Sequence, residues 1–388
     1  MRHAVAGAAL LAGSVTSSVS SAQYRLRADA YFSAADPSSG LLVLSGEAHK
    51  PSWLTAETVV WLGTGDHPGD VMVASVRARD PSGYIDARLG RMLVTAGAIR
   101  PVHIDGGDVK VRAPWGTTLE VFGGIPVVSN FQPRDYDWAV GGRVAQRFGE
   151  VASLGLSYVQ MRETGVVTHE EMGIDAAMQP ARWLDAAATA AVDLQTLALS
   201  DARISLASRF SKVRLELFAV ERSPSHLLPA TSLFSALGDV PSGRAGGSIL
   251  WHAAPRLDVY GEGAGESLAA EPGAEALLRT TLRLDDRGLG ALGLELRRES
   301  TPGASWSGVR GTARVPLSRL FAASTELELV APDDPRGRGV VWPWGLVALR
   351  FRPFPTWEAA SAFEASASPT AVSSLTGLVR LSYVLGAK

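Results

Sequence analysis

A two-residue alternation of apolar and polar side chains is the feature that most constrains how this chain folds. It is clearest between Leu277 and Arg298. One face of this stretch carries Leu278, Thr280, Leu282, Leu284, Leu292, Leu294 and Leu296, and the other carries Leu277, Arg279, Thr281, Arg283, Gly293, Glu295 and Arg297. The segment Asp285–Gly288, rich in turn-forming residues, separates the two halves. Because a period of two is that of a β-strand, the stretch predicts a hairpin with one apolar face and one charged face.

The same unit repeats along most of the chain from Gln23 onward, and turn signals divide it into about 22 strands, with a range of about 16 to 22. Short connections alternate with connections that are mostly longer. The short ones are Asp80–Gly83, Pro114–Gly116, Phe148–Glu150, Gln179–Pro180, Phe210–Ser211, Ala253–Pro255, Pro316–Ser318 and Arg352–Pro355. The others are Leu93–Gly107, Gly124–Asp137, Gly165–Thr168, Ser223–Gly243 and Pro332–Gly339. Such alternation is typical of outer-membrane barrels. The predicted fold is all-β, a single large antiparallel transmembrane β-barrel.

Periodicity alone does not separate this fold from a soluble β-sandwich, whose charged face would be solvated. Aromatic placement favours the barrel, because rings gather near the predicted turns as in the two interfacial girdles of a membrane barrel. The group assigned to the girdle at the long loops is Trp61, Phe122, Trp138, Tyr158, Phe218, Tyr260, Trp306 and Trp342. No run of about 18 apolar residues occurs that would form a transmembrane helix.

The first 22 residues have the features of a secretory signal peptide. Arg2 and His3 form a short basic region, Ala4–Gly13 is apolar, and Ser20-Ser21-Ala22 offers the small residues of a cleavage site. A disordered Ala/Ser tail is the alternative. The expected organisation is a signal peptide over residues 1–22 and a barrel over residues 23–388, located in an outer membrane.

Composition and motifs argue against several function classes. The formal net charge of −2 is unlike that of a nucleic-acid binder, and the absence of cysteine excludes disulfides and thiolate metal sites. His169-Glu170-Glu171 lacks the second histidine of a helical zinc motif. Loop-borne Ser225, His226 and Asp239 leave an outer-membrane protease or lipase open. We expect no enzymatic activity, no cofactor and no metal.

Three short motifs carry a family resemblance: Arg88-Leu-Gly-Arg, the following Asp105-Gly, and the segment 116–124, which ends in Phe-Gly-Gly. In these the chain resembles the porin-type barrels of Gram-negative outer membranes, especially the larger substrate-selective and alginate-export-like ones. The likeness to a barrel extends from about residue 23 to the C-terminus. It departs from the family at the end, where Leu-Ser-Tyr-Val-Leu is followed by Gly-Ala-Lys instead of a terminal aromatic residue.

The expected function is a porin-like outer-membrane channel for passive diffusion of small polar or anionic solutes. The alternative is a structural or surface-interaction barrel whose external loops bind a partner. A wide lumen needs loops to narrow it, and the candidates are Leu93–Gly107 and Ser223–Gly243. The expected pore-lining residues are Arg100, His103, Asp105, Arg279, Arg283, Arg310, Arg314, Arg350, Arg352, Glu326 and Glu328. The expected partners are outer-membrane lipid and small solutes, with a homo-oligomer left open and no nucleic acid.

Overall fold

A computed structural model describes residues 23–34, 39–49, 53–64, 69–127, 136–222, 242–268, 271–301, 305–335, 340–367 and 374–386. The segment 1–22, expected to be a signal peptide, and most of Ser223–Gly243 lie outside these residues. Within the described part of the chain, no helix has the length and apolar character needed to cross a membrane.

Twenty-two strands make up the described fold. The first eleven are β1 (Gln23–Ser33), β2 (Ser39–His49), β3 (Leu54–Gly63), β4 (Gly69–Arg79), β5 (Ile85–Val94), β6 (Val102–Arg112), β7 (Thr117–Pro126), β8 (Tyr136–Phe148), β9 (Ala152–Glu163), β10 (Val166–Ala181) and β11 (Leu184–Asp193). The others are β12 (Ala198–Phe210), β13 (Val213–Arg222), β14 (Ser242–Ala254), β15 (Leu257–Leu268), β16 (Glu271–Arg283), β17 (Ala291–Ser300), β18 (Trp306–Pro316), β19 (Phe321–Pro332), β20 (Trp342–Phe354), β21 (Trp357–Ser366) and β22 (Ser374–Gly386).

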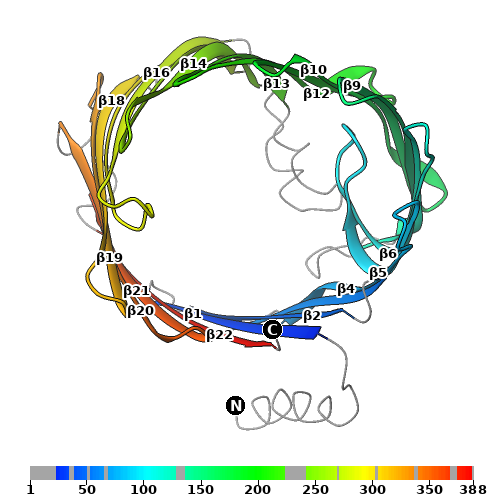
Figure 1. Ribbon diagram of the computed structural model, residues 1–388, viewed down its shortest axis with the longest axis horizontal. Helices are drawn as coiled ribbons and strands as arrows, with labels where there is room; N and C mark the ends of the chain where they lie inside the picture. The colour runs from blue at the N-terminus through cyan, green and yellow to red at the C-terminus, as the bar shows by residue number, and fades with distance from the viewer. Residues whose placement is uncertain are drawn as a thin grey trace.

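Each strand pairs antiparallel with its neighbours in sequence, and β1 pairs with β22, with Leu26 opposite Leu385. The sheet therefore closes on itself, and Figure 1 shows the resulting ring. The prediction of one closed antiparallel barrel of 22 strands is confirmed. Several predicted connections are wrong in their bounds, among them Arg352–Pro355, because β20 extends to Phe354. Gln179–Pro180 lies inside β10, and the β9–β10 connection is only Thr164–Gly165 because β10 already begins at Val166.

The two faces of the wall differ as the alternation requires. On β16 and β17, Leu282 and Leu294 point outward and are 41% and 52% exposed, whereas Glu295 on the inner face is 7% exposed and accepts a hydrogen bond from Arg279 Nε at 2.7 Å. Exposed leucine, valine and isoleucine recur on the outer face of most strands. Because a closed barrel leaves no unpaired strand edge, this apolar outer surface suits a hydrocarbon environment.

The hairpin formed by β5 and β6 departs from the cylinder. In Figure 1 it projects from the wall into the ring. Gly90, Gly106 and Gly124 lie side by side in register on β5, β6 and β7. Gly90 has a φ of 122°, and a Cβ there would lie 2.1 Å from the Ala74 carbonyl oxygen. A side chain is therefore excluded where β5 bends inward.

The expected long loop Leu93–Gly107 is wrong in its bounds, because β5 extends to Val94 and β6 begins at Val102. The connecting segment is 95–101. His103 and Asp105 consequently belong to a strand instead of a loop. The apolar residues Val102 and Ile104 extend the strand because they are buried against the inner wall.

The girdle predicted at the long loops is also largely wrong. The strand register places Trp61, Phe122, Phe218, Tyr260, Trp306 and Trp342 on the same face as the ion-paired arginines and acids, which is the lumen face. Of the predicted group, Trp138 and Tyr158 lie on the outer face, 37% exposed each. At the short turns, Trp183 and Phe210 stack outside the barrel with ring centroids 6.0 Å apart.

Candidate functional site

The lumen wall is lined by ion pairs that join adjacent strands or bridge across one strand to the next. Arg143 on β8 donates from Nε to Asp175 on β10 at 2.9 Å, and Arg222 on β13 contacts Asp201 on β12 at 2.8 Å. The Arg244 guanidinium contacts three carboxylates: that of Glu262, that of Glu275 at 2.8 Å and that of Glu266 at 3.2 Å. Ion pairs that remain in contact with water contribute about 0–1 kcal/mol each. Their main effect is to give the lumen a fixed polar surface.

Charge is distributed unevenly along the strands of the β15–β21 sector. Near the short turns the lumen face carries Arg283, Arg314, Arg350 and Arg352, with Asp258 and Glu358 as acids. Near the long loops it carries Glu266, Glu275, Glu299 and Glu364. The sector is therefore basic toward the turns and acidic toward the loops.

The eight lumen residues expected on β16 to β20 all share this inner face. Arg279 pairs with Glu295, Arg310 with Glu326, and Arg283 with Asp258 at 3.3 Å. Arg352 donates to the Pro355 carbonyl oxygen at 3.0 Å. Arg314, Arg350 and Glu328 form no ion pair with any other residue in the described ranges. Among the described residues, the guanidinium groups of Arg314 and Arg350 thus have no carboxylate partner, and that of Arg352 contacts only a neutral carbonyl.

The inward hairpin packs on the lumen wall through apolar side chains. Its residues Met92, Val94, Ala96, Ile99, Val102 and Ile104 join Phe122, Ala139, Val159 and Met161 of β7, β8 and β9 in one buried cluster. Met92, Ile104, Val159 and Met161 are fully buried. The hairpin is thereby fixed against one side of the lumen by a core of its own.

Polar contacts at the hairpin tip add to this core. The Arg100 backbone N–H donates to Glu171 Oε2 at 3.4 Å, and the His169 Nε2 atom lies 3.2 Å from the same oxygen. Glu171 is fully buried. Gly97 approaches the Arg143–Asp175 pair so closely that a Cβ there would lie 2.6 Å from an Asp175 oxygen. Arg100, expected to line the pore, is therefore placed against the wall through its backbone.

A seam separates β4 from β5 on the loop side of Gly90, Gly106 and Gly124, the three glycines that we name the hinge. Their ladder ends at Ala74 and Arg91, although β4 begins at Gly69. Side chains of the hairpin satisfy the unpaired β4 carbonyls, because Arg91 Nη1 donates to Val71 O at 3.0 Å and His103 Nε2 donates to Met72 O at 2.8 Å. Asp105 holds Arg91 in place with a 2.7 Å contact. His103 and Asp105 therefore join the hairpin to β4.

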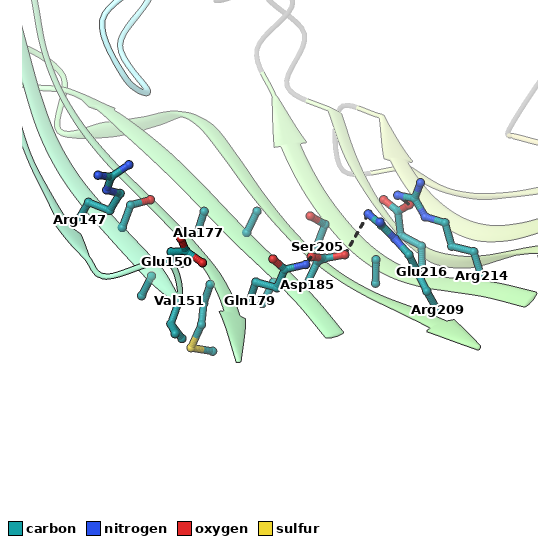
Figure 2. A pocket seen from close by; sticks show the side chains of 16 residues that line it. Arg147, Glu150, Val151, Ala177, Gln179, Asp185, Ser205, Arg209, Arg214 and Glu216 are labelled. Carbon is teal, nitrogen blue, oxygen red and sulfur yellow. Dashed lines mark hydrogen bonds and ion pairs between the residues drawn. The ribbon is translucent and has the colours of Figure 1, made fainter. Parts of the chain in front are cut away.

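A shallow hollow of about 360 Å³, lined by charged and apolar side chains, lies at the turn end of β8 to β13. Figure 2 shows Arg147, Gln179, Asp185 and Arg209 around it, with an ion pair of 3.0 Å between Arg209 and Asp185. Alanine and serine side chains also line it, together with Val151 and Met178. The opposite charges around it are largely paired with each other, so the hollow does not define a ligand of one charge.

Among the described residues, no group of three or more His, Asp or Glu side chains is arranged to hold a metal ion. The loop residues Ser225, His226 and Asp239 lie outside the described residues.

The sequence matches no protein-family model and no curated protein. Solved structures share the fold at low identity. The ferric enterobactin receptor PfeA, in complex with BCV-L6, is similar with a TM-score of 0.58 and 7% identity over 95% of this chain and 82% of that chain. The E. coli P pilus tip assembly intermediate PapC-PapD-PapK-PapG is similar with a TM-score of 0.55 and 9% identity over 93% of this chain and 60% of that chain. Pseudomonas aeruginosa OpdK with vanillate is similar with a TM-score of 0.41 and 11% identity over 94% of this chain and 99% of that chain.

The closed barrel with its apolar outside defines the class of protein. It is an outer-membrane-type β-barrel of 22 strands, and this fold places it in the outer membrane.

The hinge was missed by sequence reasoning, although its signal was present. Gly90, Gly106 and Gly124 lie in the three motifs that carry the porin resemblance, Leu-Gly-Arg, Asp-Gly and Phe-Gly-Gly. Glycine inside three consecutive strands indicates a bend or a close backbone approach.

Proposed function

We propose that the protein is an outer-membrane channel for passive diffusion of small polar or anionic solutes. One observation carries the proposal: a closed barrel encloses a charged inner surface. For strands about 4.8 Å apart and tilted by about 40°, 22 strands enclose a backbone cylinder about 44 Å across. The β5–β6 hairpin and its apolar core occupy part of that section and narrow the path.

The resemblance to substrate-selective and alginate-export-like porins belongs to the same proposal. The proposal also includes a signal peptide over residues 1–22, outer-membrane lipid and small solutes as partners, and transport without enzymatic activity.

The experiment that tests the channel is conductance of the folded protein in a planar bilayer. Folding is verified first by the change in gel mobility on heating that resistant barrels show in SDS. We expect stepwise current increments that scale with salt concentration. A heat-modifiable protein that inserts without conducting would contradict the proposal and favour the alternative of a barrel that binds a partner through its loops.

Arg314 and Arg350 give the proposed selectivity. Uncompensated guanidinium groups lower the barrier for anions, and salt screens them over about 8–10 Å at physiological strength. We expect a mild anion preference in reversal potentials, strongest at low salt. Replacing both residues by glutamine should reduce the preference, whereas replacing both by lysine should retain it because the charge is kept. Equal selectivity of the two double variants would refute this role.

A further inference from the structure

The outer face of β8, β9 and β10 carries polar side chains at its loop-side end. The strand register pairs Arg162 with Trp138 and Gln160 with Glu170, and Tyr158 is the next residue of β9 on the same face. Trp138 and Tyr158 are both exposed on the outside of the barrel. We name Trp138, Tyr158, Gln160, Arg162 and Glu170 the outer cluster. These side chains face the surrounding membrane instead of the lumen.

The outer cluster lies where the apolar outer surface of these strands ends. On the turn side of it, Val144, Leu156 and Ile174 are register partners, and all three are exposed on the outer face. On the loop side, β9 ends one residue after Arg162. Tryptophan and tyrosine at such a boundary are typical of the membrane–water interface. The outer cluster is therefore at the depth of the lipid headgroups.

The Arg162 guanidinium has no carboxylate partner among the described residues. It lies over the Trp138 ring, 5.3 Å from the ring centroid. The carboxylates on the neighbouring strands have other partners, since Asp137 accepts a backbone N–H at 2.6 Å and Glu170 accepts the Tyr158 hydroxyl at 2.5 Å. The aromatic ring positions the guanidinium but leaves its charge without a counter-ion from the wall.

Arg298 on β17 provides a comparison within the same barrel. It shares the outer parity of Leu294 and Leu296 and also lies near the loop end of its strand. Its guanidinium contacts the Asp333 carboxylate at 2.6 Å. The charge of Arg298 is matched within the protein, whereas the charge of Arg162 is available to a group in the membrane.

Hydrogen-bond acceptors beside Arg162 extend what the outer cluster can bind. The Tyr158 hydroxyl and Gln160 Nε2 both donate to Glu170 Oε1, the second at 3.2 Å. Glu170 Oε2 is thereby left without a partner in the described part of the chain. The outer cluster therefore presents one guanidinium, whose geometry matches phosphate oxygens, next to a carboxylate oxygen that can accept a hydroxyl.

We propose that the outer cluster binds the headgroup of a phosphorylated glycolipid, with a phosphate on Arg162 and a sugar hydroxyl on Glu170. The long connections of an outer-membrane barrel face the cell exterior, and phosphorylated glycolipid is typical of the exterior leaflet of such a membrane. The acyl chains would lie along the apolar row of Val144, Leu156 and Ile174. The proposal rests on the membrane location of the barrel and is independent of conduction through its lumen.

The test is native mass spectrometry of the folded barrel in a neutral detergent, with diphosphorylated lipid A as the probe. We expect one tightly bound lipid A per barrel. Arg162→Gln should raise the dissociation constant roughly 10-fold or more, because a charged hydrogen-bonded contact is lost. Arg298→Gln is the matched control and should leave the dissociation constant unchanged, because Arg298 is already paired with Asp333. Heat-dependent gel mobility verifies that each variant is folded.

Further comparisons identify the headgroup. Lipid A without its phosphates should bind wild type about as weakly as diphosphorylated lipid A binds the Arg162→Gln variant, and inorganic phosphate should not displace the lipid. Glu170→Gln should retain lipid A, because an amide still bonds a hydroxyl and no longer repels the phosphate. Phosphatidylethanolamine, whose ammonium would use the Glu170 charge, should bind less tightly than lipid A.

Equal affinity of wild type and Arg162→Gln for lipid A would overturn the proposal. So would preferred binding of phosphatidylethanolamine that is lost in Glu170→Gln. Conductance of the same preparations separates the site from the channel. A barrel that binds lipid A without conducting would retain the site and refute the channel, and a conducting barrel without lipid A binding would do the reverse.

Discussion

Phe122→Ala should release the β5–β6 hairpin from the lumen wall. The Phe122 ring is 2% exposed and lies in the cluster that joins the hairpin to β7, β8 and β9. Truncating a buried phenylalanine costs about 3–5 kcal/mol, and every 1.4 kcal/mol is a tenfold change in an equilibrium. The population of released hairpin should therefore rise by about two to nearly four powers of ten, while the closed ladder of the barrel remains.

The chain contains no cysteine, so a single cysteine at a buried position of the hairpin reports its release. Ala96 is 1% exposed and small enough for Ala96→Cys to be tolerated. The rate of labelling by a water-soluble thiol reagent should follow the released population, and should rise at least a hundredfold when Phe122→Ala is added.

The matched control is Val121→Ala on the same strand, because Val121 faces outward and is 50% exposed. It should leave the labelling rate of the Ala96→Cys protein unchanged. Equal labelling rates in the Phe122→Ala and Val121→Ala proteins would show that the apolar cluster does not hold the hairpin, and would refute the reasoning.

Three further predictions concern the wall, the hinge and one turn. Leu282→Arg should impair assembly, since arginine facing hydrocarbon costs up to about 2–4 kcal/mol, whereas Arg283→Leu should be tolerated; the yield of heat-modifiable barrel measures both. Gly90→Ala should reduce that yield because of the 2.1 Å approach to a carbonyl, and Gly107→Ala, where the nearest atom is 3.7 Å away, should not. Backbone N–H groups donate to the Asp285 carboxylate and hold its pKa below the usual value. The turn at Asp285 should therefore stay ordered at any pH above the usual carboxyl pKa and lose its order as the pH falls through the lowered pKa. An NMR titration of the turn measures this.

The strands could be predicted because the face of each residue depends only on local parity. The alternation that placed Arg283 and Glu295 on one face needed no knowledge of the rest of the chain, and the structure has them on the lumen side. The same parity also places Trp306 with Arg310 and Arg314. The girdle assignment ignored this, and relied on the position of the ring along the strand instead of its face.

The inward hairpin could not be predicted by the same rule. Met92 and Ile104 are apolar, as are the lipid-facing leucines, and they fall on the parity of the lumen. A hydrophobic residue at a lumen position is explained only when the element that covers it is known. That covering comes from the bend at Gly90, which is a property of tertiary packing.

The two sides of this wall differ in what stabilises an apolar side chain. On the outside, a leucine that packs against another chain exchanges contact with lipid for contact with an equally apolar side chain, so this packing contributes little hydrophobic free energy. On the inside, Met92, Ile104, Val159 and Met161 are withdrawn from a water-filled lumen, where each buried side chain contributes about 1.5–3 kcal/mol. The hairpin therefore folds toward the lumen, because only there does packing its apolar face remove that face from water.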